Sequence, residues 1–363
     1  MARRCADSEC VTKLGTKQRR SDRFLTALRA ASGVTFVSHV NPDPDSLAAM
    51  LGLAHLVDVK LRIPTRMTRD GLISRAENRA MVDTLRLNLI PIDQLVLQPG
   101  EAIVMVDSQP KTGRHSFQNM PITAVLDHHD TPGDLDDVPF TDIRSQLGAT
   151  CTLVTRYLIE QEVEIPERVA TALTYAIETE VSGYPREAGP MDDAMLQFLY
   201  PMANKELISR IRNARLPHSH FECMLQALTS SFIYDRMIVS WVNDLPQPEQ
   251  AAEVVDFLVR FEKVDWAICA GVHGDKLIIS VRTSLPNAQA GDMIRKVVGD
   301  LGKAGGHDRR AGGCILLQST SQSAIEDLQA ELRRRLLRVL DIDEVRGKRL
   351  VPLRDIRDNL PGL

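Results

Sequence analysis

The chain has 363 residues, a formal net charge of -4, 44% hydrophobic residues and 25% charged residues. This length exceeds what one hydrophobic core usually serves, so two domains are expected in a globular fold of ordinary composition. The net negative charge argues against a protein that grips long nucleic acid by charge alone, because such proteins are usually basic.

The sequence also lacks the marks of a membrane or secreted protein. No stretch approaches the roughly 20 apolar residues needed to cross a bilayer, and the charged N-terminus has no apolar run of the kind found in secretory signals. Widely spaced cysteines without a CxxC pair fit a reducing compartment, so a cytoplasmic location is predicted. They are Cys5, Cys10, Cys151, Cys223, Cys269 and Cys314.

The first half of the chain alternates strand patterns with helix patterns. Residues 1–20 are polar and are predicted to form a mobile tail, and a helix with Phe24, Leu25 and Leu28 on one face follows. Apolar runs predict buried strands, and the segments between them have helical periodicity, so a doubly wound parallel sheet is expected. The strands are predicted at 34–38, 102–106 and 122–126, and the helices from Ser46 onward and at 149–160 and 169–177.

The second half has a different order of elements. Helices punctuated by prolines are predicted over 191–235, and mixed strands and helices follow to 340, which indicates a smaller α/β domain with a mixed sheet. Its strands are predicted at 236–242, 265–272, 276–282 and 314–317, and its helices at 249–261, 291–301 and 323–340. The predicted parts of the chain are thus a tail (1–20), a first domain (21–190), a helical connector (191–235), a second domain (236–340) and a C-terminal tail (341–363).

Acidic and histidine side chains follow each predicted strand of the first half. Each has an ordinary explanation when taken alone, since Asp is a common helix cap or turn residue and loop histidines are usually solvated. Together they fall at the carboxyl ends of strands in one parallel sheet, where such sheets bind ligands. Carboxylates with imidazoles suit a divalent ion such as Mn²⁺, and one carboxylate can bridge two ions. The residues are His39, Asp43, Asp45, Asp107, Asp127, His128 and His129.

These motifs resemble those of the DHH phosphoesterase family. The segment His39-x-Asn41-Pro42-Asp43-x-Asp45-Ser46 is similar to its first motif, Asp107 to its second, and Asp127-His128-His129 to its third. Where the family usually has Thr-Asp-Thr-Gly, this chain has Thr179-Glu180-Val181-Ser182-Gly183. Glu180 would therefore replace an aspartate, and Glu178 remains an alternative counterpart.

The resemblance implies a role for each residue of these motifs. His39 and Asp43 would bind one ion, Asp45 and His128 the other, and Asp107 both, with a contribution from Glu180. His129 would lie near the scissile phosphate as a donor or acid, and Asp127 would orient a histidine. Two Mn²⁺ ions are implied, with Mg²⁺ or Co²⁺ as substitutes, and they would activate the attacking water.

The second half resembles the DHH-associated C-terminal domain. Its motifs are Ser280-x-Arg282 on a strand, followed by Gly305-Gly306-His307, where relatives often have a third glycine in place of Ala304. Glycines allow a phosphate to approach the backbone closely, and an arginine can grip it with two donors. Ser280, Arg282, Gly305, Gly306 and His307 are therefore predicted to bind substrate, with Arg309 and Arg310 either in contact with it or solvated.

The size and the Gly-Gly-His motif are most similar to the NrnA-like oligoribonuclease and 3′-phosphoadenosine-5′-phosphate phosphatase group. The implied substrates are short RNAs, linear dinucleotides and that bisphosphate, with no membrane or long duplex partner. A RecJ-type single-strand exonuclease and a non-catalytic nucleotide sensor are the alternatives. A homodimer is compatible with the sequence.

Overall fold

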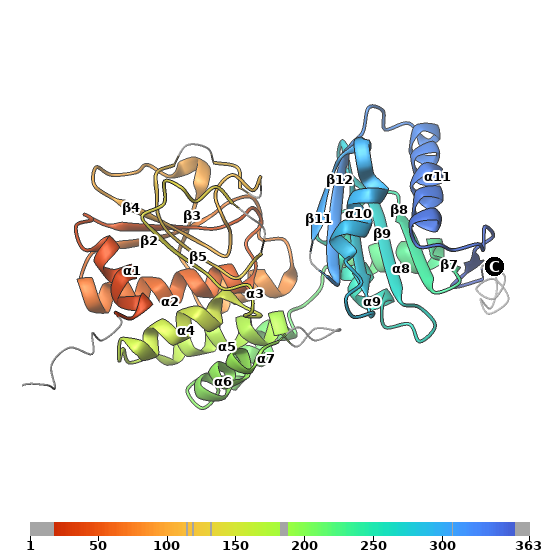
Figure 1. Ribbon diagram of the computed structural model, residues 1–363. Coiled ribbons are helices and arrows are strands. Elements are labelled where there is room, and N and C mark those ends of the chain that lie inside the picture. The colour runs from red at the N-terminus through yellow and green to blue at the C-terminus, as the bar shows by residue number, and fades with distance from the viewer. Residues whose placement is uncertain are drawn as a thin grey trace, which may run out of the picture. The chain divides into compact units, whose positions relative to one another are not determined.

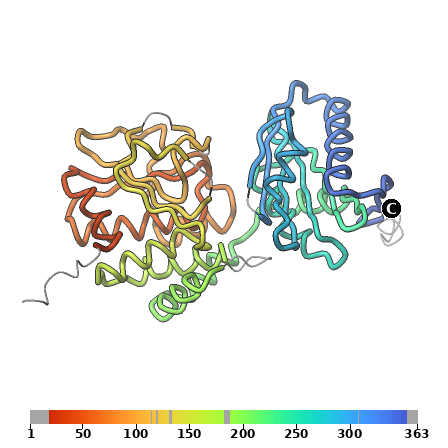
Figure 2. The backbone as a smooth tube through the Cα atoms, in the orientation of Figure 1, coloured from red at the N-terminus to blue at the C-terminus, as the bar shows by residue number. Residues whose placement is uncertain are grey.

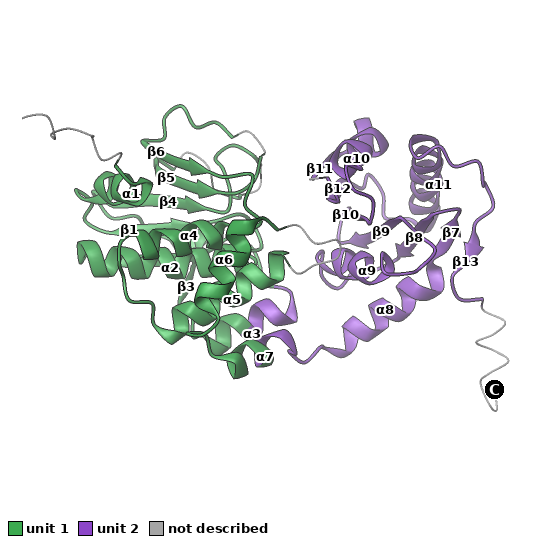
Figure 3. Ribbon diagram, turned by 60° about the horizontal axis from the view of Figure 1, so that its bottom comes forward, with its two compact units in different colours: residues 1–73, 81–181, 188–209 green, residues 74–80, 182–187, 210–363 purple. Residues whose placement is uncertain are grey.

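The computed structural model describes residues 18–113, 115–117, 120–130, 133–181, 188–306 and 308–352. It divides into two compact units, coloured separately in Figure 3. The first comprises residues 1–73, 81–181 and 188–209, and the second comprises residues 74–80, 182–187 and 210–363. The segment predicted as a helical connector is shared between the units, since its residues up to 209 cluster with the first unit.

The first unit is built on a six-stranded parallel sheet, which confirms the predicted fold class. Its strand order is β3-β2-β1-β4-β5-β6, and every pair of neighbours is parallel. The chain therefore adds β2 and β3 on one side of β1, and then adds β4, β5 and β6 on the other side. The strands are β1 (Val34–Val37), β2 (Thr65–Arg69), β3 (Leu89–Pro91), β4 (Ala102–Val106), β5 (Ile122–Asp127) and β6 (Phe140–Ile143).

Helices cover this sheet, as the ribbon and the tube show (Figures 1 and 2). The apolar helix α2 is buried along most of its length and packs against α4 and α5. Helix α1 buries Phe24, Leu25 and Leu28, as its periodicity predicts. The helices of this part of the chain are α1 (Arg20–Leu28), α2 (Pro44–Leu61), α3 (Ala76–Thr84), α4 (Thr150–Glu160), α5 (Glu167–Val181), α6 (Pro190–Leu199) and α7 (Lys205–Arg212), with a 3₁₀ turn at Ile92–Gln94.

The second unit contains a seven-stranded mixed sheet, again as predicted. Its order is β11-β12-β10-β9-β8-β7-β13, in which only β8 and β9 pair in parallel. Strand β13 lies in the segment for which the sequence predicted only a tail. The strands are β7 (Phe232–Tyr234), β8 (Met237–Val242), β9 (Trp266–His273), β10 (Lys276–Thr283), β11 (Lys303–Gly306), β12 (Arg310–Leu316) and β13 (Lys348–Arg349).

Alternate residues of this sheet face two separate cores. Leu277, Ile279 and Val281 of β10 pack in one core with residues of α10 and α11, while Ile278 packs in the other with residues of α8 and α9. This alternation is the period of two that a strand buried on both faces requires. The helices of the unit are α8 (His218–Ser230), α9 (Gln250–Leu258), α10 (Ala290–Val298) and α11 (Gln322–Val339), with a 3₁₀ turn at Gly299–Leu301. No helix among the described residues is long and apolar enough to span a membrane.

Candidate metal centre

The strand order of the first unit creates a binding position beside β1 and β4. These neighbours are the strands from which the chain winds in opposite directions, and parallel sheets bind ligands at the carboxyl ends of such strands. His39 follows β1, Asp107 follows β4, and Asp127 ends β5. The fold therefore brings together the three motifs that the sequence places at strand ends.

Asp43 and the prolines around it shape the turn that leads into α2. Asp43 is the N-cap of this helix, and its Oδ1 accepts a hydrogen bond from the backbone N–H of Ser46 at 3.0 Å. Pro44 occupies the first helical position, where its missing N–H costs nothing. The helix thus begins two residues earlier than the sequence predicted, and Asp45 lies in its first turn.

His39 directs one ring nitrogen at two carboxylates. Its Nδ1 lies 2.9 Å from the carbonyl oxygen of Val40, which can only accept, so Nδ1 carries the proton. Its Nε2 then lies 3.6 Å from Oδ2 of Asp43 and 3.3 Å from Oδ2 of Asp107. This Nε2 is buried and has no hydrogen-bond partner among the described residues. A buried nitrogen surrounded by carboxylate oxygens is the arrangement that a divalent cation would complete.

Asp107 is shared by both halves of the cluster. It is 1% exposed and has a φ of 54°, which is unusual for a residue other than glycine. Its Oδ2 faces His39, while its Oδ1 lies 3.4 Å from Nε2 of His128. Asp107 belongs to two groups of three side chains that could each hold a metal ion. One group is His39, Asp43 and Asp107, and the other is Asp107, His128 and His129. Within each group, the ligand atoms lie within 4.8 Å of one another.

His128 and His129 are oriented by different acceptors. Nδ1 of His128 donates to the carbonyl of Leu147 at 3.1 Å, which leaves its Nε2 facing Asp107. Nδ1 of His129 lies 2.7 Å from Oδ1 of Asp127, as the predicted orienting role of that carboxylate requires. Burial alone would raise the pKa of Asp127, but His129 lowers it to about 2. The same Nδ1 lies 3.7 Å from Oδ1 of Asp107, so Asp127 fixes the ring of His129 beside the shared carboxylate.

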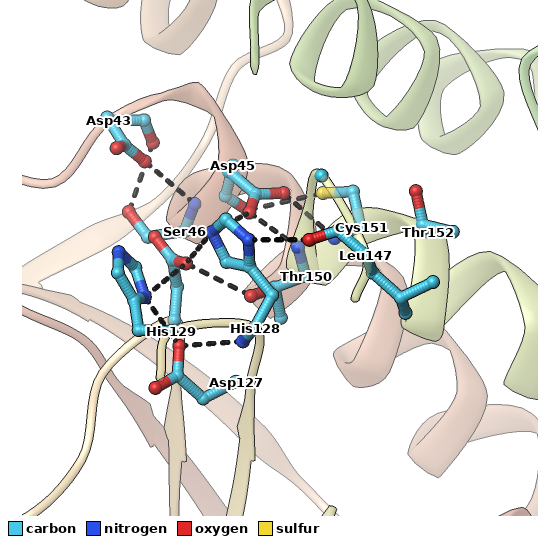
Figure 4. Close-up of polar contacts among 12 residues, drawn as sticks. Asp43, Asp45, Ser46, Asp127, His128, His129, Leu147, Thr150, Cys151 and Thr152 are labelled. Atoms are coloured by element: carbon cyan, nitrogen blue, oxygen red, sulfur yellow. Dashed lines mark hydrogen bonds and ion pairs between the residues drawn. The ribbon is translucent and has the colours of Figure 1, made fainter. Parts of the chain in front are cut away.

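The carboxylate of Asp45, a residue of α2, faces the N-terminus of α4 (Figure 4). Its Oδ2 accepts from the backbone N–H of Thr150 at 2.7 Å, and its Oδ1 accepts from that of Cys151 at 2.8 Å. Nε2 of His128 is 3.8 Å from Oδ2 of Asp45. The structure therefore places Asp45 beside His128, as expected for the second ion, although the more compact ligand group contains His129 instead.

Glu180 ends up near the same half of the cluster. It lies in the last turn of α5. Burial and the charge of Asp107 are the largest causes that raise the pKa of Asp45, and the charge of Glu180 raises it further. Burial lowers the pKa of His128, but the charges of Asp107, Asp45 and, to a smaller extent, Glu180 raise it. The alternative counterpart, Glu178, is two residues earlier and therefore roughly 200° away around the helix. Only one of the two can face the cluster, and the electrostatic effect indicates Glu180.

The cluster carries more negative charge than its histidines balance. Burial would lower the pKa of His39, but Asp107 and Asp43 raise it well above its ordinary value. Burial would likewise lower the pKa of His128, whereas the charges of Asp107 and Asp45 raise it to about 9. Carboxylates that raise the pKa values of buried histidines mark a site that favours positive charge, which a metal cation would supply in place of these protons.

Two of the predicted substrate-binding residues lie on β10. Ser280 is buried opposite Cys269 and Gly312, on the α9 side of the sheet. The guanidinium of Arg282 is mostly buried, and its Nε donates to Oδ1 of Asp256 at 2.7 Å. Asp256 therefore already compensates the charge that was predicted to grip a phosphate.

The Gly-Gly segment, predicted to bind substrate, lies in a strand. Gly305 and Gly306 belong to β11 and pair with Gly312 and Ala311. A Cβ at Gly306 would lie 2.4 Å from Cα of Ala311, so close packing of two backbones explains this glycine. A Cβ at Gly305 would meet only a side-chain atom, at 3.7 Å. His307 lies outside the described residues.

Residues that the sequence did not single out support the cluster. Gln109 is 3% exposed, and its Nε2 donates to Oδ2 of Asp127 at 2.8 Å and to the carbonyl of His129 at 3.1 Å. Its Oε1 accepts from the N–H of Gly133 at 2.9 Å. Backbone atoms also hold the cluster: the N–H groups of Thr150 and Cys151 donate to Asp45, and the carbonyl of Leu147 accepts from His128. The residue types at these positions do not reveal such backbone contacts. Gln109 could have been suspected only from its position two residues after Asp107.

Solved structures of other proteins share this fold. An exopolyphosphatase-related protein from Bacteroides fragilis has the same fold, with a TM-score of 0.72 at 16% identity over 88% of this chain and 97% of that one. A putative family II inorganic pyrophosphatase from Methanococcus jannaschii matches with a TM-score of 0.43 at 16% identity over 82% of this chain and 99% of that one.

Sequence comparison finds a relative and a family model that matches part of the chain. An uncharacterised protein of Methanocaldococcus jannaschii is 26% identical over 315 residues, which is 85% of this chain and 64% of that protein. This chain thus spans less than two thirds of the length of that relative. Residues 33–177, which carry the first three strand-end motifs, match the N-terminal domain of the DHH family.

Proposed function

We propose that the protein is a metal-dependent phosphoesterase whose centre holds two divalent cations. The observation that carries the proposal is the pair of compact ligand groups that share the buried carboxylate of Asp107. The match of residues 33–177 to the DHH family supports the same reading. Mn²⁺ is the proposed ion because the ligands are carboxylates and imidazoles without a thiolate.

The residues would divide between the ions as the motifs imply. His39 and Asp43 would hold one ion, His128 and Asp45 the other, with Asp107 between them and Glu180 nearby. Such ions lower the pKa of water and neutralise charge on phosphoryl oxygens when they are bound. His129, whose Nδ1 lies 2.7 Å from Oδ1 of Asp127, would donate to a phosphoryl or leaving oxygen in its protonated form.

The second unit is proposed to anchor the part of the substrate that does not react. Arg282 donates from Nε to Asp256 and from Nη1 to the carbonyl of Val281 at 2.9 Å, so its Nη2 would be the nitrogen that contacts a phosphate. Gly305 and Gly312 face each other across β11 and β12, in register with Ser280. This row of small residues would let a phosphate or sugar approach the backbone of β11 and β12 closely. Binding energy from such contacts aids positioning at the reacting centre.

Short oligoribonucleotides, linear dinucleotides and 3′-phosphoadenosine-5′-phosphate are the proposed substrates. The net charge of -4 disfavours long polyanions, since their binding depends on many phosphate contacts. This argues against a RecJ-type exonuclease. A non-catalytic sensor would have no need of the donor arrangement around Asp107. The similar Bacteroides fragilis structure is that of an exopolyphosphatase-related protein, so polyphosphate belongs among the substrates tested.

Turnover by the purified protein with Mn²⁺ or Mg²⁺ tests the proposal. The panel comprises a 5′-phosphorylated dinucleotide, a five-residue RNA, long single-stranded DNA, 3′-phosphoadenosine-5′-phosphate, pyrophosphate and polyphosphate. Hydrolysis of the short RNAs or the bisphosphate, lost in Asp107→Ala with the fold intact, is expected. Preference for long DNA, pyrophosphate or polyphosphate would reassign the substrate. Binding of nucleotides without hydrolysis of any substrate would contradict the enzyme assignment.

A further inference from the structure

Thr150 connects two of the proposed metal ligands. It is the first residue of α4 and is completely buried. Its backbone N–H donates to Oδ2 of Asp45 at 2.7 Å, and its hydroxyl donates to Oδ1 of Asp107 at 3.0 Å (Figure 4 shows Thr150 beside Asp45). Asp45 comes from α2 and Asp107 from the end of β4, so a single residue joins carboxylates from two separate elements.

The two contacts of Thr150 depend on different atoms. Asp45 is held by the backbone N–H groups of Thr150 and Cys151, which belong to the first turn of α4 and have no partner within the helix. A change of side chain leaves these donors in place. The contact with Asp107 depends on the hydroxyl alone. The hydroxyl can therefore be removed while the backbone cradle of Asp45 remains.

The orientation of the Asp107 carboxylate determines whether it can serve both halves of the cluster. Oδ2 lies 3.3 Å from Nε2 of His39, and Oδ1 lies 3.4 Å from Nε2 of His128. The terminal torsion of an aspartate is broad, so packing alone fixes it only loosely. A donor on Oδ1 restricts that rotation. It occupies one lone pair of this oxygen and leaves another for a cation.

We propose that Thr150 is a positioning residue, whose hydroxyl fixes the carboxylate of Asp107 so that its two oxygens face the two halves of the metal centre. This inference rests on the proposed two-ion centre. It assigns to α4 a role beyond burying its apolar face, because the first turn of the helix orients Asp45 through its backbone and Asp107 through one hydroxyl.

Three variants isolate the hydroxyl. Thr150→Val keeps the shape and removes the donor, and Thr150→Ser keeps the donor and removes the methyl group. Thr155→Val is the matched control, because Thr155 is also buried in α4 and its hydroxyl donates to the carbonyl of Cys151 at 2.7 Å, away from the carboxylates. If Thr150→Val fails to fold by thermal unfolding, Thr150→Ala replaces it.

Mn²⁺ affinity and stoichiometry by calorimetry, and the exchange-coupled Mn²⁺ signal by electron paramagnetic resonance, are measured for each protein. Thr150→Val is expected to bind the weaker ion about 10- to 100-fold less tightly, as for other residues that orient ligands, and to lose most of the coupled signal. Thr150→Ser and Thr155→Val should remain close to wild type. Crystal structures without metal should show a rotated Asp107 carboxylate in Thr150→Val only.

Wild-type Mn²⁺ affinity and coupling in Thr150→Val would overturn the inference, and so would equal losses in Thr150→Ser and Thr150→Val, since the hydroxyl would then be irrelevant. Absence of Mn²⁺ binding by the wild-type protein would instead refute the two-ion centre. In that case the metal-free crystal structures still decide about Thr150, because an unrotated Asp107 in Thr150→Val would show that the hydroxyl does not position it.

Discussion

At the scale of single residues, each histidine of the candidate centre is oriented through its Nδ1. The acceptors are the carbonyl of Val40, the carbonyl of Leu147 and the carboxylate of Asp127. The residue types predicted which side chains gather at this edge of the sheet, because His and Asp at successive strand ends have few other roles in combination. The acceptors could not be predicted, since two of them are backbone atoms and the third depends on the fold.

Gln109 gives the first test at this scale. Gln109→Ala removes the donors to Asp127 and to the carbonyl of His129 and leaves the N–H of Gly133 without its acceptor. Because the bond to Asp127 is buried and the other two are partly buried, the free energy of unfolding should fall by about 1–3 kcal/mol. With His129 less well oriented, kcat should fall more than KM rises. Urea unfolding and steady-state kinetics measure both.

The matched control is Gln161→Ala. Gln161 is half-buried in the same unit, and its amide donates to Ser21 and Asp22, which lie outside the candidate centre. It should lower stability without changing the ratio of the two kinetic effects. A wild-type kcat in Gln109→Ala would show that the amide does not support His129.

Glu101 provides a test of pH dependence away from the centre. Burial raises its pKa, but hydrogen bonds from Gln98, Thr35 and Arg66 lower it below the ordinary value. A carboxyl with a depressed pKa in the folded protein stabilises it above the unfolded pKa, and the effect is lost as the pH falls through the folded value. Glu101→Gln should therefore cost about 1–2 kcal/mol at pH 7 and less near pH 3. Equal costs in urea unfolding at both pH values would contradict this account.

At the scale of elements, the apolar runs of the first unit predicted β1, β4 and β5 but not β2, β3 or β6. Strands β1, β4 and β5 were predicted because they are buried on both faces. Strand β2 is Thr-Arg-Met-Thr-Arg and only partly buried, so its residues carry no apolar signal. Strand β11 was missed because glycines at 305 and 306 suggest a turn, whereas here they permit close pairing of backbones.

Replacing the two glycines of β11 should have different effects, on stability for Gly306 and on substrate binding for Gly305. Gly306 has a φ of 151°, and a Cβ there would lie 2.4 Å from the carbonyl oxygen of Arg310. Gly306→Ala should therefore destabilise the protein by about 1–3 kcal/mol. Gly305→Ala has room and should leave stability nearly unchanged while raising KM, if phosphate approaches that backbone. Thermal unfolding and kinetics compare them, and a wild-type KM in Gly305→Ala would exclude this contact.

At the scale of the whole molecule, the charge balance sets the dependence on salt. A substrate with few phosphates releases few counterions, so the logarithm of its affinity should change with the logarithm of salt concentration with a slope of about -2 or shallower. The affinity for a 5′-phosphorylated dinucleotide, measured by calorimetry with Asp107→Ala between low and physiological salt, tests this. A much steeper slope would indicate a binding surface for a long strand.

The two-unit organisation could be predicted from length and from the change in the order of elements, but its boundaries could not. Helices α6 and α7 look like a connector in the sequence, yet residues up to 209 cluster with the first unit. Asp192 explains part of this: its buried carboxylate accepts from Gly148 at 2.9 Å and from Thr152 at 2.6 Å, which fastens α6 to α4. A buried aspartate on a surface-like helix gives no such signal in the sequence.

Anomalous diffraction from crystals grown with Mn²⁺ would show whether two cations share the carboxylate of Asp107. Two anomalous peaks are expected beside Asp107, one bounded by His39 and Asp43 and the other by His128. The second peak would also show whether Asp45 or His129 completes that half of the centre. Crystals soaked in Mn²⁺ that show no peak at Asp107, or a single peak held without it, would contradict the account.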